Sequence, residues 1–255
     1  MLMALIGCSG SESVTDPVET SEDPNTEPST FTEPAETRPG GVRGLVTDTS
    51  GQGVAEGKLT FCVPLGLCTN ATTEADGTFE ILNAGDNTYA FEVSGKDDVL
   101  ATTVIPLTVT GAMLMQDITL PALDPSSPMP AQPEEVEMGE GMFLTIGVNE
   151  LTPPLFVPSA TEVAGVRVPE EIWVPGPENE TVLAQWHLSP YNHKSANGLP
   201  LRVANDIGAA DGEVFQVWVS DYDSGTWLSG GTLTASGGWL EGGSLPVVST
   251  VVITP

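Results

Sequence analysis

Apolar and polar residues alternate along much of the chain from residue 41 onward. Val42 and Val46 fall on one face of a predicted strand, and Leu59 and Phe61 fall on one face of the next. Successive side chains of a strand point to opposite faces of its sheet, so this period of two predicts half-buried strands. No segment shows the 3.6-residue apolar period of an amphipathic helix. The pattern predicts an all-β fold.

Residues 41–122 form the first predicted domain. Its strands are short and separated by turn residues, and their inward positions are Val42, Val46, Leu59, Phe61, Phe79, Ile81, Tyr89, Phe91, Val93, Leu107, Val109, Ile118 and Leu120. The pair Asp76-Gly77 predicts a hairpin turn, because it tolerates the positive φ that tight hairpins need. Frequent turns between alternating strands favour an antiparallel β-sandwich.

Residues 141–255 form the second predicted domain, after a Pro-rich acidic linker over 123–140. Its alternating apolar positions include Met142, Leu144, Ile146 and Val148 in one strand and Phe215, Val217 and Val219 in another. The stretch 216–243 predicts two consecutive hairpins. We therefore expect two antiparallel β-sandwich domains in series.

Residues 9–40 lack apolar periodicity and are dominated by Ser, Thr, Glu and Pro. Such a segment buries too little apolar surface to offset the entropy of ordering, so we expect a disordered acidic tether. The whole chain carries 35 Asp and Glu against 7 Lys and Arg, for a net charge of -28. This field repels phosphate, so neither nucleic acid nor an anionic membrane surface is expected as an electrostatic partner.

The first eight residues end in Leu5-Ile6-Gly7-Cys8, which resembles the lipobox of bacterial lipoproteins. The resemblance implies cleavage before Cys8 and acylation of that cysteine, with palmitate among the chains, so that the membrane is a partner through a lipid anchor. It implies a place in the bacterial cell envelope, at the outer membrane or the cell surface. No Lys or Arg precedes Cys8 and the apolar run is short, which favours a true start codon upstream. The alternative is a chance apolar N-terminus on a soluble protein.

Residues 41–122 also resemble the carboxypeptidase regulatory-like domain. The motifs that carry the resemblance are Gly44–Asp48, Thr73–Phe79 and Asn87–Val93, while Gly53 stands where the family has Pro. The resemblance implies a seven-stranded, transthyretin-like Greek-key sandwich of the carbohydrate-binding-like group, with no catalytic residues. Because a fold does not fix function, sugar binding by this domain is an analogy.

The chain has three cysteines, an odd number. If Cys8 carries lipid, Cys62 and Cys68 remain as a pair, and an exported compartment permits a disulfide between them. A loop this short stabilises a fold by about 2 kcal/mol in the chain-entropy model. Two free thiols are the alternative.

The sequence contains few residues in patterns that suit catalysis or metal binding. His187 and His193 are the only histidines, and His187 is expected to face solvent because it alternates with Trp186. Asp221 and Asp223 have the spacing of a calcium loop, but the rest of that loop is missing, which favours a hairpin turn. We predict no catalytic residue, no metal and no cofactor, and hence no enzyme.

All five tryptophans lie in the second predicted domain. Trp218, Trp227 and Trp239 are the candidates for stacking on a sugar ring, with Trp218 the most exposed because it shares its face with Gln216 and Ser220. Two functions remain open. One is a non-catalytic, lipid-anchored structural or interaction module that contacts an envelope protein. The other is a lipoprotein that binds carbohydrate or cell wall.

Overall fold

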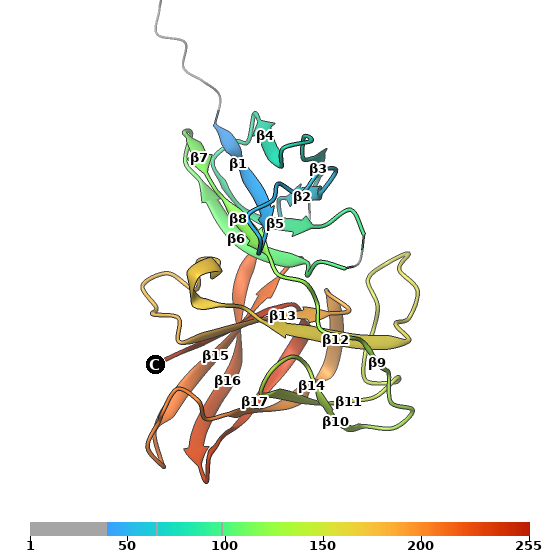
Figure 1. Ribbon diagram of the computed structural model, residues 1–255, viewed down its shortest axis with the longest axis vertical. Coiled ribbons are helices and arrows are strands. Elements are labelled where there is room, and N and C mark those ends of the chain that lie inside the picture. Colours follow the sequence, from blue (N-terminus) through green and yellow to red (C-terminus); the bar gives the residue numbers. More distant parts are fainter. Residues whose placement is uncertain (1–39, 65, 98) are drawn as a thin grey trace, which may run out of the picture. The chain divides into compact units, whose positions relative to one another are not determined.

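The computed structural model describes residues 40–64, 66–97 and 99–255, shown as the coloured ribbon in Figure 1. Within these ranges the regular elements are strands, apart from one short 3-10 helix, η1 (Glu170–Ile172). The predicted all-β fold is therefore confirmed. Cys8 and residues 9–39, predicted as lipidation site and tether, lie outside the described residues. No helix in the described part of the chain is long and apolar enough to cross a membrane.

The first module is built from two four-stranded sheets. One contains β4 (Thr78–Leu82), β1 (Gly41–Asp48), β7 (Met113–Met115) and β8 (Ile118–Leu120), in which β7 and β8 pair in parallel with successive halves of β1. The other has the antiparallel order β3 (Cys68–Thr72), β2 (Lys58–Cys62), β5 (Asn87–Ser94) and β6 (Thr103–Val109). Their facing side chains form one buried cluster, as in a sandwich.

The predicted inward positions of this module are buried, among them Val42, Phe61, Phe91 and Ile118. The Asp76-Gly77 turn forms, with Gly77 at φ +87. It is not the expected hairpin, however, because the strands on either side of it, β3 and β4, belong to different sheets. Turn chemistry sets the local reversal, whereas the partner of each strand is set by the sandwich as a whole.

The second module is one ten-stranded antiparallel sheet that curls around a single apolar core (Figure 1). Its order is β10 (Glu134–Glu137), β11 (Met142–Ile146), β14 (His193–Ala204), β17 (Trp239–Val248), β16 (Thr226–Ser236), β15 (Val214–Asp221), β18 (Thr250–Thr254), β13 (Ala184–Ser189), β12 (Glu162–Arg167) and β9 (Ser127–Pro128). The fully buried Trp186 lies in this core with Leu144, Val217 and Leu240.

The second module differs from the sequence-based expectations at two places. The range 123–140, expected to be a linker, contributes β9, β10 and the fully buried Met138 to the second module. Val148, expected to extend the strand of Met142, lies beyond the end of β11 and is exposed. The two hairpins expected over 216–243 are present as β15–β16 and β16–β17.

Candidate functional site

The outer face of the second sheet of the first module is buried rather than open to water. Ala90, Glu92 and Val104 point away from the first core, and strand alternation alone would leave them exposed. Each has less than a tenth of its surface accessible, because residues of the second module cover them. We call this contact the intermodule interface, and it gathers more buried polar groups than the sequence suggests.

Thr250 in β18 lies at the centre of the intermodule interface. Its hydroxyl oxygen accepts a hydrogen bond from the backbone amide of Val104 at 3.2 Å, and it lies 3.4 Å from the hydroxyl of Thr103. The Nδ1 atom of His187, in β13, lies 3.1 Å from the same hydroxyl oxygen of Thr250. Thr103, Thr250 and His187 are all fully buried. One hydroxyl therefore links two strands of the second module to β6 of the first.

His187 was expected to face solvent, and this expectation is wrong. It does alternate with Trp186, but the outer face of β13 is covered, and the side chain is fully buried. Burial lowers the pKa of His187 to about 3, so the imidazole is neutral at pH 7. His193 is buried separately, with Nδ1 3.1 Å from the carbonyl oxygen of Tyr191. Among the described residues, no group of three or more metal-binding side chains comes together.

Among the described residues of the first module, Glu92 of β5 is the one buried carboxyl group at this interface. Burial raises its pKa, while hydrogen bonding to the Tyr191 hydroxyl and the positive charge of Lys58 oppose the rise. Burial together with the Glu92 charge also raises the pKa of Tyr191, and that of Tyr222 to about 12. Glu92, Tyr191 and Tyr222 come from three segments that are far apart in the sequence, so no local sequence motif predicts that they come together.

Cys62 and Cys68 form a disulfide, as predicted from the sequence. They are directly opposite each other in the β2–β3 pair, so the bond closes the end of this hairpin. The Tyr222 hydroxyl of the second module lies 2.8 Å from the sulfur of Cys62 and 3.6 Å from that of Cys68. The disulfide thereby forms one border of the intermodule interface.

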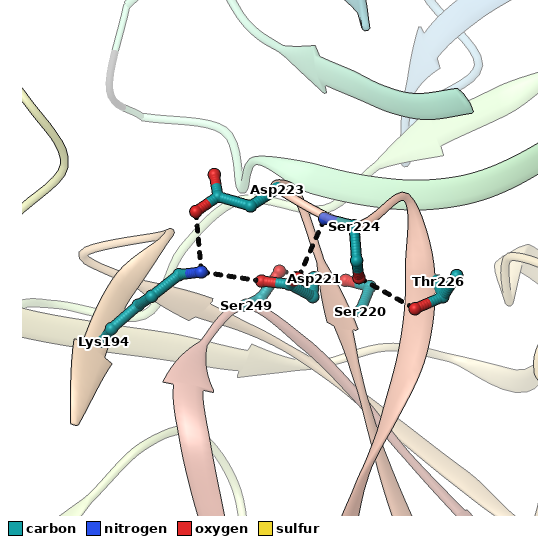
Figure 2. A network of polar contacts seen from close by, with 7 residues as sticks. All are labelled: Lys194, Ser220, Asp221, Asp223, Ser224, Thr226 and Ser249. Carbon is teal, nitrogen blue, oxygen red and sulfur yellow. Dashed lines mark hydrogen bonds and ion pairs between the residues drawn. The ribbon is translucent and has the colours of Figure 1, made fainter. Parts of the chain in front are cut away.

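The turn between β15 and β16, in the second module, contains Tyr222 and so faces the disulfide of the first module. Figure 2 shows the polar contacts of this turn. The Lys194 ammonium lies 2.7 Å from the Asp223 carboxylate and 3.3 Å from that of the buried Asp221. The other oxygen of Asp221 accepts the amide of Ser224 at 2.9 Å. These contacts agree with the prediction of a hairpin turn, since a lysine already occupies the space between the two carboxylates.

Gly225 ends this turn and touches the first module. Its φ is +62, and a Cβ added there would lie 3.0 Å from the backbone nitrogen of Ala90. Both the backbone conformation and the close approach to β5 therefore favour glycine. Behind the turn, the buried hydroxyls of Ser220 and Ser249 lie 2.9 Å apart.

The candidate stacking tryptophans do not form one platform. Trp218 and Trp227 are diagonal neighbours on the outer face of β15 and β16, since Trp218 pairs with Ser229 and Ser220 pairs with Trp227. Trp239 pairs with Ser236, nine residues further along β16 and so roughly 30 Å away at about 3.3 Å per residue.

All three tryptophans are half-buried. Trp218 donates its indole N–H to the Thr254 hydroxyl at 3.1 Å. The guanidinium of Arg202 lies over the ring of Trp239, 4.2 Å from its centroid, and the ring of Phe143 meets Trp239 edge-on at 5.6 Å. The expectation that Trp218 faces away from the core is met, since Phe215, Val217 and Val219 are buried on the other side. Ser220, expected to share an open face with it, is instead fully buried.

A separate open groove of about 550 Å³ lies on the first module and was not foreseen from the sequence. Arg43, Leu45, Glu80, Met115 and Asp117 are among the residues that line it. The Nε atom of Arg43 donates to the sulfur of Met115 at 3.0 Å, so the one cation of the groove is already engaged.

No family model matches this chain, and no curated protein matches it. Among solved structures, it is similar to a proposed carbohydrate-binding protein of Bacteroides uniformis, with 9% identity, a TM-score of 0.28 and coverage of 85% of this chain and 79% of that one. It is also similar to a variant of BcpA, the major pilin subunit of Bacillus cereus, with 8% identity, a TM-score of 0.29 and coverage of 81% and 85%. At these TM-scores neither protein's role transfers to this chain.

Proposed function

We propose that this protein is a non-catalytic, lipid-anchored component of the bacterial cell envelope, whose two β modules act as one stiff structural or interaction unit. The observation that carries the proposal is the intermodule interface, where the Thr250 hydroxyl satisfies the Val104 amide of the other module. Buried polar pairs are costly to break, because each partner would be left without a hydrogen bond. Such an interface holds two modules in one fixed arrangement.

The placement of the titratable groups supports a structural role over a catalytic one. Glu92 and His187 are two groups whose pKa values are shifted mainly by burial, and such shifts are a common mark of an active site. Here both lie inside the intermodule interface, packed against backbone and hydroxyl groups. A substrate would have to separate the modules to reach them, so their shifted pKa values follow from packing.

The anchor is inferred from sequence. The resemblance of Leu5-Ile6-Gly7-Cys8 to a lipobox supports acylation of Cys8, and the acidic composition of residues 9–39 supports a spacer between the lipid and the first strand. The two-sheet sandwich of β1–β8 supports the proposed kinship with the carboxypeptidase regulatory-like domain. An exported lipoprotein is also a setting in which the Cys62–Cys68 disulfide persists.

Metabolic labelling with palmitate tests the anchor. The gene is expressed in a bacterium together with its natural upstream sequence, and the protein is compared with the variants Cys8→Ala and Ser9→Ala. We expect label and detergent-phase partitioning for the parent and for Ser9→Ala, and neither for Cys8→Ala. Label that persists in Cys8→Ala, or a parent that stays unlabelled in the aqueous phase, would exclude a lipid anchor at this residue.

Glycan binding is a second proposed function, favoured by one observation. Trp218 and Trp227 are half-buried neighbours on the same outer face, where two indole rings can flank the apolar side of a sugar. A glycan array with the parent chain and Trp227→Ala tests it, with Trp173→Ala as the matched control. Binding that Trp227→Ala alone abolishes supports this function, and an array without binding rejects it.

A further inference from the structure

An apolar loop tip projects from the second module between β11 and β12. Leu155, Phe156 and Val157 are consecutive, and 82%, 96% and 44% of their surfaces are accessible. Phe156 is the most exposed of the large apolar residues described. Single exposed apolar residues are common on soluble proteins, but three neighbours at the end of one loop form a contiguous patch.

The loop is built to hold this tip away from the body of the module. At its base, Thr152 and Lys194 exchange two backbone hydrogen bonds of 2.8 and 2.9 Å. Nearer the tip, the amide of Val157 donates to the carbonyl of Pro154 at 3.1 Å, which closes a tight turn. Phe156 has φ +67, a conformation that a bulky side chain rarely adopts. The backbone thus bears strain at the residue whose ring is fully presented to solvent.

The loop is uncharged along its whole length. Between Glu150 and Glu162 the sequence contains no charged residue, and Pro153, Pro154 and Pro158 stiffen the segment on both sides of the tip. A convex, uncharged and apolar tip fits an apolar phase rather than an ionic or polar partner. The net charge of -28 further argues against attraction to an anionic surface.

We propose that the Leu155–Val157 tip inserts into the interface of a phospholipid bilayer with a zwitterionic surface. This inference rests on the proposed lipid anchor, which selects the bilayer over other apolar partners. Residues 9–39, between Cys8 and the described unit, could span at most about 110 Å. The unit therefore stays near one membrane, where a weak second contact is favoured by its high local concentration.

Insertion of the tip should have a measurable effect on the partitioning of the protein to membranes. Phe156 contributes the largest apolar surface of the three residues, and transfer of such a side chain out of water changes a partition constant by roughly tenfold or more. Because the three side chains enter together, Leu155→Ser and Phe156→Ser should each weaken membrane partitioning. Neither residue belongs to either apolar core, so the fold should tolerate both changes.

The test uses the full 255-residue chain with Cys8→Ala, so that no lipid anchor contributes. Flotation with phosphatidylcholine vesicles at millimolar lipid is compared for this chain and for the same chain carrying Phe156→Ser. The matched control carries Leu67→Ser, which removes a large apolar side chain of similar fractional exposure, 90%, from the first module. We expect flotation of the parent and of the Leu67→Ser control, and a loss of about tenfold or more in partitioning for Phe156→Ser.

Three results would overturn the proposal. The parent chain could fail to float, the Phe156→Ser chain could float equally well, or Leu67→Ser could lose as much as Phe156→Ser. A parent that forms a dimer in light scattering without vesicles, and loses it with Phe156→Ser, would assign the tip to a second copy instead. Because no acyl chain is present, failure here leaves the palmitate result on Cys8 unaffected, and the two proposals can fail separately.

Discussion

The Thr250 hydroxyl accepts a hydrogen bond from the backbone amide of Val104 at 3.2 Å, across the boundary between two separately formed apolar cores. β6, which carries Val104, is the edge strand of its sheet. An amide that points outward from an edge has no acceptor within its own sheet and needs one from elsewhere. The second module supplies that acceptor, so the edge of one sheet is completed by a side chain of another.

Thr250→Val should therefore destabilise the protein without changing the shape of the side chain. The substitution leaves the Val104 amide and one nitrogen of His187 buried without their partner, which costs about 1–3 kcal/mol of unfolding free energy. Urea unfolding of the disulfide-intact chain measures this loss. Thr234→Val, on an exposed position of β16, is the control and should change little. Equal unfolding midpoints for the two variants would contradict the role given to Thr250.

Glu92→Gln should stabilise the protein at neutral pH and have little effect in acid. The folded-state pKa of Glu92 is raised, so its favourable contribution is present below the unfolded-state pKa, near 4.5, and is lost as the pH rises through the folded-state pKa. The amide of Gln stays neutral throughout. Melting temperatures of both chains between pH 3 and pH 8 should diverge as the pH rises. Parallel curves would show that Glu92 titrates as if it were exposed.

His187 should have the opposite pH dependence. Its folded-state pKa is lowered to about 3, whereas the unfolded chain binds a proton near pH 6.5. The unfolded state therefore gains protons first as the pH falls, and stability decreases between about pH 6.5 and pH 3. In His187→Gln this part of the acid dependence should disappear. Urea midpoints at pH 7, 6, 5 and 4 measure it, and an unchanged slope in the variant would argue against a buried neutral imidazole.

The sequence predicts each module well where one strand face is core and the other is water. Phe91 and Val93 follow the alternation because their neighbours along β5 and across it decide their burial. The same rule fails for Glu92 and His187, because contacts between the two modules, whose partners are far apart in the sequence, cover their outer faces. Period-two patterning contains no information on such a contact. The sequence therefore did not reveal the interface, and β18, which carries Thr250, was not among the predicted strands.

The turn at Asp76-Gly77 and the position of Trp218 were also predicted only as far as local sequence determines them. Asp76-Gly77 correctly predicted a reversal, but whether its flanking strands pair depends on the whole sandwich. Trp218 was correctly placed on the face opposite Val217, yet Ser220 on the same face as Trp218 is fully buried, with its hydroxyl against that of Ser249. The disulfide could be predicted because it depends only on spacing and compartment.

Removal of the disulfide should cost about 2 kcal/mol, as expected for closure of a short loop. The variant Cys62→Ser with Cys68→Ser and the reduced parent should unfold at similar urea concentrations, both lower than the oxidised parent. Mass spectrometry of a non-reduced digest should contain the linked peptides. Two alkylatable thiols in the native protein, or equal stability of oxidised and reduced chains, would contradict the bond.

The central claim is that the intermodule interface joins the two modules into one stiff unit. Spin labels at Glu80→Cys in β4 and Thr234→Cys in β16, introduced with Cys8→Ala and with the disulfide intact, report the distance between the modules. Gly225→Val is the disrupting variant, because a side chain there meets the backbone of Ala90. Pulsed electron resonance should give one narrow distance distribution for the parent and a broad one for Gly225→Val. A broad distribution in the parent would contradict the claim.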